Sequence, residues 1–189
     1  MCILDLSKLW MYKFHYDSIK RQYGNKTKLL FTDTDSLCYH ITTDDFYKEM
    51  DKEQYDLSDY PKDSDFHSNK NKKVLGKFKD ECKGKAPLEY VGLRPKMYCI
   101  QIPDEKDKKT AKGVKNSAQK KIGHADYKRC IESKELKDQR QMSKACAIRS
   151  FKHEIKSIEQ NKVGLCAYDN KRYLLKDGIT SYAYGHHKI

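Results

Sequence analysis

The chain has little of several features that mark common protein classes. Only four of its 189 residues are Pro, and 38% are hydrophobic, including 14 Tyr and 6 Phe, which argues against wholesale disorder. No apolar run approaches the ~18 residues of a membrane-spanning helix, and the mean hydropathy is −0.95. Asp5 interrupts the first apolar residues too early for a secretory signal. These absences exclude a membrane protein and predict an intracellular one.

Closely spaced cysteine pairs are also missing. The seven cysteines, at positions 2, 38, 82, 99, 130, 146 and 166, are odd in number and far apart. This spacing fits neither a disulfide framework nor a paired zinc knuckle, so we interpret them as reduced thiols. A mixed metal site of Cys166, His186 and His187 is conceivable, but the lack of a close Cys pair argues against it.

Positive charge is abundant and unevenly distributed. The chain has 39 Lys and Arg against 27 Asp and Glu, a net charge of +12. Residues 1–95 hold 17 basic and 16 acidic residues, whereas residues 96–189 hold 22 and 11, so almost all of the excess lies in the second half. Such a block can be a solvated surface, but it also indicates a polyanionic partner.

The hydrophobic pattern predicts an α+β protein in which an antiparallel sheet and packed helices precede a small basic region. Apolar residues at helical spacing predict a helix over 2–23, and short strands over 28–31 and 36–41 flank an acidic turn. The remaining predictions are a helix over 44–50, a loop over 57–73, strands over 74–79, 89–93 and 96–102, a charged loop over 103–109, a helix over 124–136, and strands from 146 with turns at 169–170 and 177–178.

The acidic turn Thr32-Asp33-Thr34-Asp35 is the first candidate for chemistry. It places two carboxylates at a hairpin tip, where they can approach one hard cation such as Mg²⁺ from the same side. A divalent ion would relieve the repulsion between the two charges. Asp-x-Asp is common in solvated turns, however, so the tripeptide alone favours an ordinary solvated turn over a metal site.

The neighbouring residues carry a family resemblance. Phe31-Thr32-Asp33-Thr34-Asp35-Ser36-Leu37 resembles the palm motif of family B DNA polymerases, and Arg94-Pro95-Lys96-Met97-Tyr98 resembles the Lys-x-Tyr motif of the same family. Further segments are similar to the protein-primed branch, particularly to polymerases of Polinton or Maverick transposons. Those segments are residues 11–16, 43–47, 75–81, 92–98, 111–115 and 169–173.

The resemblance implies a DNA-directed DNA polymerase with primer-template DNA, dNTP and a possible priming protein as partners, and a nuclear location if the source is a eukaryotic transposon. Residues 1–115 would be the C-terminal part of the palm and residues 116–189 a thumb-like region. Carried over by position, Asp35 and Asp33 would be the catalytic, Mg²⁺-binding carboxylates, and Thr34 and Ser36 would shape their turn. The implied DNA-binding residues are Lys96, Tyr98, Lys112 and Lys115. Phe31 departs from the family, which usually has Tyr there.

Two features of the family are not found in the sequence. Two-metal nucleotidyl transfer uses a second carboxylate strand, carried in the family by an Asp-x-x-Ser-Leu-Tyr-Pro motif, and a fingers helix that holds the triphosphate. Neither is present, and the first predicted helix begins at Met1 without a cap. We therefore expect a fragment of a larger polymerase that is inactive by itself.

Two other functions fit parts of the pattern. Metal-dependent glycosyltransferases also place Asp-x-Asp at a strand end, where it holds manganese and a sugar nucleotide, but the basic half argues against them. A non-catalytic DNA-binding remnant of a transposon polymerase would keep the basic surface without the chemistry. Alternation along the strand over 96–102 makes a separate prediction: Lys96 and Tyr98 share the DNA-facing side, while Met97 enters the core.

Overall fold

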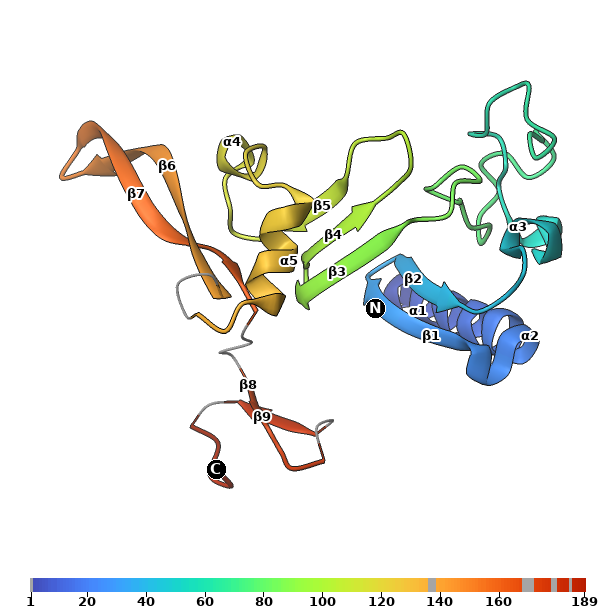
Figure 1. Cartoon of the computed structure of the whole chain (residues 1–189), viewed down its shortest axis with the longest axis horizontal. Coiled ribbons are helices and arrows are strands. Elements are labelled where there is room, and N and C mark those ends of the chain that lie inside the picture. The colour runs from blue at the N-terminus through green and yellow to red at the C-terminus, as the bar shows by residue number, and fades with distance from the viewer. Residues whose placement is uncertain (1, 136–138, 168–171, 178–179, 184) are drawn as a thin grey trace. The chain divides into compact units, whose positions relative to one another are not determined.

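The computed structural model describes residues 2–135, 139–167, 172–177, 180–183 and 185–189 (Figure 1). Helices and antiparallel sheets both occur, which confirms the α+β class. The chain divides into two compact units, Met1–Pro87 and Leu88–Ile189, which we call the first and second units. The assignment of residues 1–115 to a palm and 116–189 to a thumb stays a prediction.

The first unit begins with a continuous helical segment, which confirms the helix predicted over 2–23. Helix α1 (Cys2–Lys13) continues through a π-helix (Phe14–Lys20) into the short helix α2 (Arg21–Tyr23). No side chain of α1 is buried, whereas Phe14 and Ile19 enter the core. Trp10 of α1 lies against Gly76, but the buried side chains of this segment begin with the π-helix.

A two-stranded antiparallel sheet follows, formed by β1 (Thr27–Asp33) and β2 (Ser36–Ile41), and we call it the acidic hairpin. Helix α3 (Phe46–Glu49) is shorter than the helix predicted over 44–50, because Asp45 caps it through the amides of Tyr47 and Lys48. The core of the first unit is rich in Tyr and consists of Phe14, Ile19, Tyr23, Met50, Tyr55, Leu57 and Tyr60.

Residues 51–87 contain one short 3₁₀ helix (Lys52–Gln54) and no strand, so the strand predicted over 74–79 is wrong. Phe78 makes only an isolated parallel bridge to Tyr55. The backbone turns at Lys73 (φ +58°) and Gly76 (φ +80°), and such left-handed residues are incompatible with an extended strand. Of the apolar residues in this segment, only Phe78 packs against the core, whereas Val74 and Leu75 are exposed.

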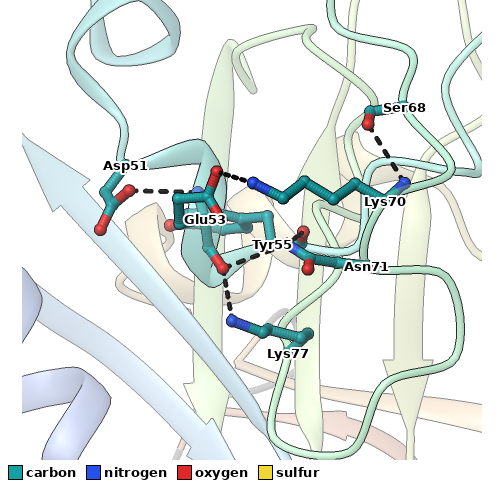
Figure 2. A network of polar contacts seen from close by, with 7 residues as sticks. All are labelled: Asp51, Glu53, Tyr55, Ser68, Lys70, Asn71 and Lys77. Carbon is teal, nitrogen blue, oxygen red and sulfur yellow. Dashed lines mark hydrogen bonds and ion pairs between the residues drawn. The ribbon is translucent and has the colours of Figure 1, made fainter.

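Polar contacts hold this irregular region in place (Figure 2). Asn71 donates hydrogen bonds to the carbonyls of Glu53 and Tyr55 at 3.1 and 3.0 Å. The Lys70 ammonium lies 2.6 Å from the Glu53 carboxylate, and the Lys77 ammonium donates to the Glu53 carbonyl at 2.6 Å. Side chains thus bind the backbone groups that strands would otherwise pair.

The second unit is built on a three-stranded antiparallel sheet of β3 (Glu89–Arg94), β4 (Met97–Gln101) and β5 (Lys108–Ala111), with β4 in the centre. Pairing of the first two strands was predicted, whereas β5 replaces the end of the predicted charged loop. Helix α5 (His124–Glu132) packs against the sheet and buries Tyr127 and Cys130. The resulting core is Val91, Met97, Cys99, Ala111, Val114, Ala118, Tyr127, Cys130 and Leu165.

The described residues of the second unit also form two further hairpins and the short helix α4 (Asn116–Gln119). Strands β6 (Arg140–Phe151) and β7 (Glu154–Cys166) form a long hairpin, drawn in orange in Figure 1, and β8 (Arg172–Leu174) pairs with β9 (Ser181–Ala183). The first strand thus begins at 140 rather than 146, and α5 ends at Glu132 rather than 136, because Ser133 is extended. The turn predicted at 169–170 and position 178 of the second turn lie outside the described residues.

Candidate functional site

The acidic hairpin ends in a two-residue turn, and the predicted carboxylates lie within it and immediately before it. Asp33 is the last residue of β1 and pairs with Ser36, so that Thr34 and Asp35 form the turn. The Asp35 amide donates to the Asp33 carbonyl at 2.7 Å, and the Ser36 hydroxyl donates to the same carbonyl at 3.1 Å. The hydroxyl of Thr34 donates to the Asp33 carboxylate at 3.2 Å. Thr34 and Ser36 therefore shape this turn through direct hydrogen bonds.

The backbone of this turn is strained. Thr34 has φ +57°, in the left-handed region, where a β-branched residue is a genuine outlier. A register shift between Leu29 and Phe31 marks a β-bulge two residues before Asp33. Bulges and left-handed residues both concentrate near functional sites, where they redirect side chains. The sequence analysis missed both features, because neither leaves a recognisable residue pattern here.

The donor atoms of this turn suit a hard cation. Asp33 is partly buried and Asp35 is exposed, and Mg²⁺ is typically held by one or two carboxylates together with substrate phosphates. Cys38 pairs with Phe31, and burial together with the nearby Cys82 raises the pKa of its thiol to about 11, which disfavours the thiolate form that binds soft metals. Within the described residues no group of three or more His, Cys, Asp or Glu gathers into a metal cage. The Mg²⁺ site at Asp33 and Asp35 stays a prediction.

Strands β3 and β4 meet in a second tight turn, Pro95–Lys96, and we call the pair the basic hairpin. Lys96 is exposed with φ +59°, and its carbonyl accepts a hydrogen bond from the Lys112 amide at 3.0 Å. Met97 is 1% exposed, which confirms its predicted place in the core. Lys96 itself belongs to the turn, so strand alternation does not govern its direction and that part of the prediction is corrected.

Tyr98 lies on the sheet face opposite to Met97, beside a tyrosine that sequence analysis did not single out. Tyr98 pairs with Gly92, and the ring centroids of Tyr90 and Tyr98 are 6.2 Å apart. A Cβ atom at Gly92 would lie 2.3 Å from the Tyr90 hydroxyl, so this glycine provides the space that the Tyr90 side chain occupies. The sequence signal for this pair was the Tyr-x-Gly spacing of Tyr90 and Gly92 in β3, because the glycine leaves room on the face that Tyr90 occupies.

The other predicted DNA-binding residues lie in the second unit as well. Lys112 follows β5 at the same end of the sheet as Lys96, whereas the Lys115 ammonium donates to the carbonyl of Cys146 in β6. The structure thus brings Lys96, Tyr98 and Lys112 to one end of one sheet. Lys115 instead connects the segment before α4 to the long hairpin.

The two candidate groups belong to different units: Asp33 to Ser36 lie in the first, and the lysines with Tyr98 in the second. Of the Cys–His combination considered from the sequence, Cys166 is buried at the end of β7, and the His186 ring stacks on Tyr182 at 4.3 Å. Among the described helices none has the length and apolar character required to cross a bilayer.

Comparisons with protein-family models, with curated proteins and with solved structures each found no match.

Proposed function

We propose that the chain contributes palm and thumb elements to a DNA-directed DNA polymerase of family B, protein-primed type. The observation that carries this proposal is the strained turn that holds Asp33 and Asp35 at the end of a bulged strand. A backbone cost of about 1–3 kcal/mol is retained where the resulting geometry serves a function. In this role Asp33 and Asp35 would hold Mg²⁺, which neutralises developing negative charge on phosphate oxygens in nucleotidyl transfer.

The basic hairpin supports the same proposal. Lys96 lies at an exposed turn, as a phosphate contact requires, and Tyr98 follows two residues later in β4. Lys112 adds a second exposed cation at this end of the sheet. The group would hold the primer-template backbone without reading its sequence.

This chain supplies one carboxylate hairpin, whereas two-metal nucleotidyl transfer uses carboxylates from a second strand. We therefore expect the purified chain to bind primer-template DNA but not to extend the primer with dNTPs and Mg²⁺. The decisive test of the polymerase proposal is binding and extension by a chain restored with an upstream carboxylate strand. Extension that stops in Asp35→Ala supports the proposal, and a restored chain that binds DNA without extending it contradicts it.

A non-catalytic DNA-binding role is the second candidate, favoured by the scarcity of clustered carboxylates among the described residues. Both candidates predict DNA affinity that falls with salt, because Lys and Arg contacts release counterions from phosphates. They differ in their dependence on the acidic turn. Mg²⁺-dependent binding of dNTP that is lost in Asp35→Asn favours the polymerase role. If the restored chain shows no Mg²⁺-dependent binding of dNTP, the DNA-binding role is favoured.

Tyr98 provides a finer test of the same site. We expect Tyr98→Phe to leave DNA affinity and folding nearly unchanged in the restored polymerase, because the ring is kept. Use of the primer end should decline if the hydroxyl contacts it. Tyr90→Phe is the matched control on the neighbouring strand, and an equal effect of both variants would contradict a specific role for Tyr98.

A further inference from the structure

The β6–β7 hairpin is far longer than its packing requires. Its inner end is anchored, because Ser143, Leu165 and Cys166 are buried. Beyond that end, none of residues 144–162 is buried, and the two strands pair in unbroken register from Met142–Val163 to Phe151–Glu154. We call residues 144–162 the hairpin arm. At about 3.3 Å per residue, its strands extend more than about 20 Å from the anchored end.

The two faces of the hairpin arm differ in chemistry. Residues that pair directly, or that are two apart along a strand, share a face. Arg149 of β6 pairs with Lys156 of β7, and Phe151 is two residues after Arg149 in β6. These three side chains therefore lie on one face. The other face carries Ile148 and Ile155. The arm therefore has, near its turn, one face that is basic and aromatic.

The pairing of Arg149 with Lys156 is unfavourable in the absence of a ligand. Like charges directly opposite each other in an antiparallel pair destabilise the pair. Glu154 offsets part of this charge, because its carboxylate lies 2.9 Å from the Lys156 ammonium. Two-stranded hairpins without a packed face are marginally stable in water. An anion bound on this face would relieve the repulsion and order the arm.

Phe151 presents its ring at the end of the arm. The turn that follows, Lys152–His153, has φ +49° and +64°, as in the two-residue turns that match the twist of paired strands. The ring is 62% exposed, and the ammonium groups of Lys152 and Lys156 lie 5.7 and 6.0 Å from its centroid. An aromatic ring surrounded by cations offers a stacking surface and phosphate contacts within one short segment.

We propose that the hairpin arm binds single-stranded DNA, with an unpaired base stacked on Phe151 and phosphates held by Arg149, Lys152 and Lys156. Single strands expose both a base face and a phosphate chain, whereas duplex DNA keeps its base faces stacked and offers mainly phosphates. The inference rests on the proposed function, in which the unpaired template ahead of the primer supplies such a strand.

The test introduces a fluorescent reporter at the arm. Trp10 is the single Trp of the chain, so Phe151→Trp in a Trp10→Phe background places the only indole at the proposed stacking position. We expect oligo-dT to quench its emission, whereas a blunt duplex of equal length does not. Ile155→Trp in the same background is the matched control, because Ile155 is 78% exposed on the opposite face, and its emission should not change.

Affinity measurements complete the test with the otherwise native chain. Base stacking is worth about 1–3 kcal/mol per base, so Phe151→Ala should weaken oligo-dT binding by roughly 5-fold to 160-fold. Duplex affinity should change less than about twofold, because phosphate contacts remain. Ile155→Ala should alter neither. Circular dichroism should be unchanged for both variants, since both side chains are exposed.

The possible failures are distinguishable. If the native chain binds primer-template DNA but Phe151→Ala binds oligo-dT normally, the inference is overturned while the proposed function stands. Equal losses of single-strand and duplex affinity in Phe151→Ala would also overturn it, because the ring would then not discriminate unpaired bases. A native chain that binds neither form of DNA contradicts the proposed function itself.

Discussion

The acidic and basic hairpins share a local design but differ in what supports them. Each ends in a two-residue turn with a left-handed residue other than glycine, Thr34 or Lys96, and each has a register shift shortly before the turn. The basic hairpin lies in a three-stranded sheet with one face against α5. The acidic hairpin is a two-stranded sheet in which only Thr27 is buried.

This difference indicates how each turn keeps its geometry. Met97 and Cys99, immediately after the basic turn, are almost completely buried, so core packing fixes the backbone that presents Lys96. The acidic turn relies on hydrogen bonds among its own residues. We infer that the acidic turn suits chemistry that a bound cation organises, whereas the basic turn is a preformed contact surface. The predictions below test this contrast, starting with the largest effect.

The largest effect is expected from the acidic turn. In the restored polymerase, Asp35→Ala should lower kcat by roughly three orders of magnitude or more, because a metal-binding carboxylate acts mainly in the transition state. DNA affinity should remain within about twofold of the native value, since the turn is not the basic contact surface. Steady-state extension and fluorescence anisotropy measure the two quantities. Asp44→Ala removes an exposed carboxylate outside the turn and serves as the control.

A loss of DNA affinity equal to the loss of kcat would contradict a purely chemical role for Asp35. Unfolding of the variant would show that the aspartate is structural.

The next effect concerns the acid sensitivity of the first unit. Burial of Asp56 raises its pKa, but hydrogen bonds from the Lys73 amide and Ser58, with the Lys79 ammonium, outweigh burial and lower the pKa to about 2. Because this pKa lies below the ordinary value of about 3.9, ionised Asp56 stabilises the folded first unit. This stabilisation is complete above about pH 4 and is lost as the pH falls toward 2. Urea unfolding followed by Trp10 fluorescence at several pH values measures it.

Replacing this carboxylate gives the corresponding variant test. Asp56→Asn should lower the unfolding free energy of the first unit by about 2 kcal/mol at neutral pH and flatten its dependence between pH 4 and 2. Asp59→Asn is the matched control, because Asp59 also contacts Lys79 but is exposed, and its effect should stay below about 1 kcal/mol. An unchanged acid profile in Asp56→Asn would assign the pH dependence to other groups.

The basic turn should affect binding without affecting chemistry. Lys96→Ala should weaken primer-template binding by about 1 kcal/mol and reduce the magnitude of the log–log salt slope by about one unit. Lys83→Ala is the matched control, because Lys83 is also exposed and left-handed, at φ +51°, but lies outside this turn. Salt-dependent anisotropy measures both variants. If they bind alike, Lys96 is an ordinary surface cation.

The smallest effect tests the strain of the acidic turn. Thr34→Asn should stabilise the first unit by about 0.5–1 kcal/mol, because Asn tolerates the left-handed region better than a β-branched residue. Extension by the restored polymerase should nevertheless decline if the strained turn positions the carboxylates. Thr32→Asn makes the same substitution in an extended strand and should not stabilise the unit. Higher stability with unchanged extension would show that the strain has no catalytic use.

Several elements could be predicted because their signals are local. The helical spacing of apolar residues over 2–23 and the strands around Asp33 to Asp35 required no knowledge of distant contacts. The strand predicted over 74–79 failed because side chains far along the chain, such as Asp56 bonding the Lys73 amide, favour turns there. Lys96 was misplaced for a similar reason: the register of β4 with β3 pairs Arg94 with Met97 and puts Lys96 in the turn between them, and alternation applies only within strands.

The sequence by itself determined the α+β class, the concentration of positive charge in the second half, and the identity of the two charged turns. These depend on composition and on periodicities of a few residues. Only the tertiary structure decided which turn rests on a core, that Tyr90 adjoins Tyr98 across Gly92, and that Arg149 faces Lys156 beside an exposed Phe151. Strand register and burial depend on pairings between distant residues, and no local pattern specifies those pairings.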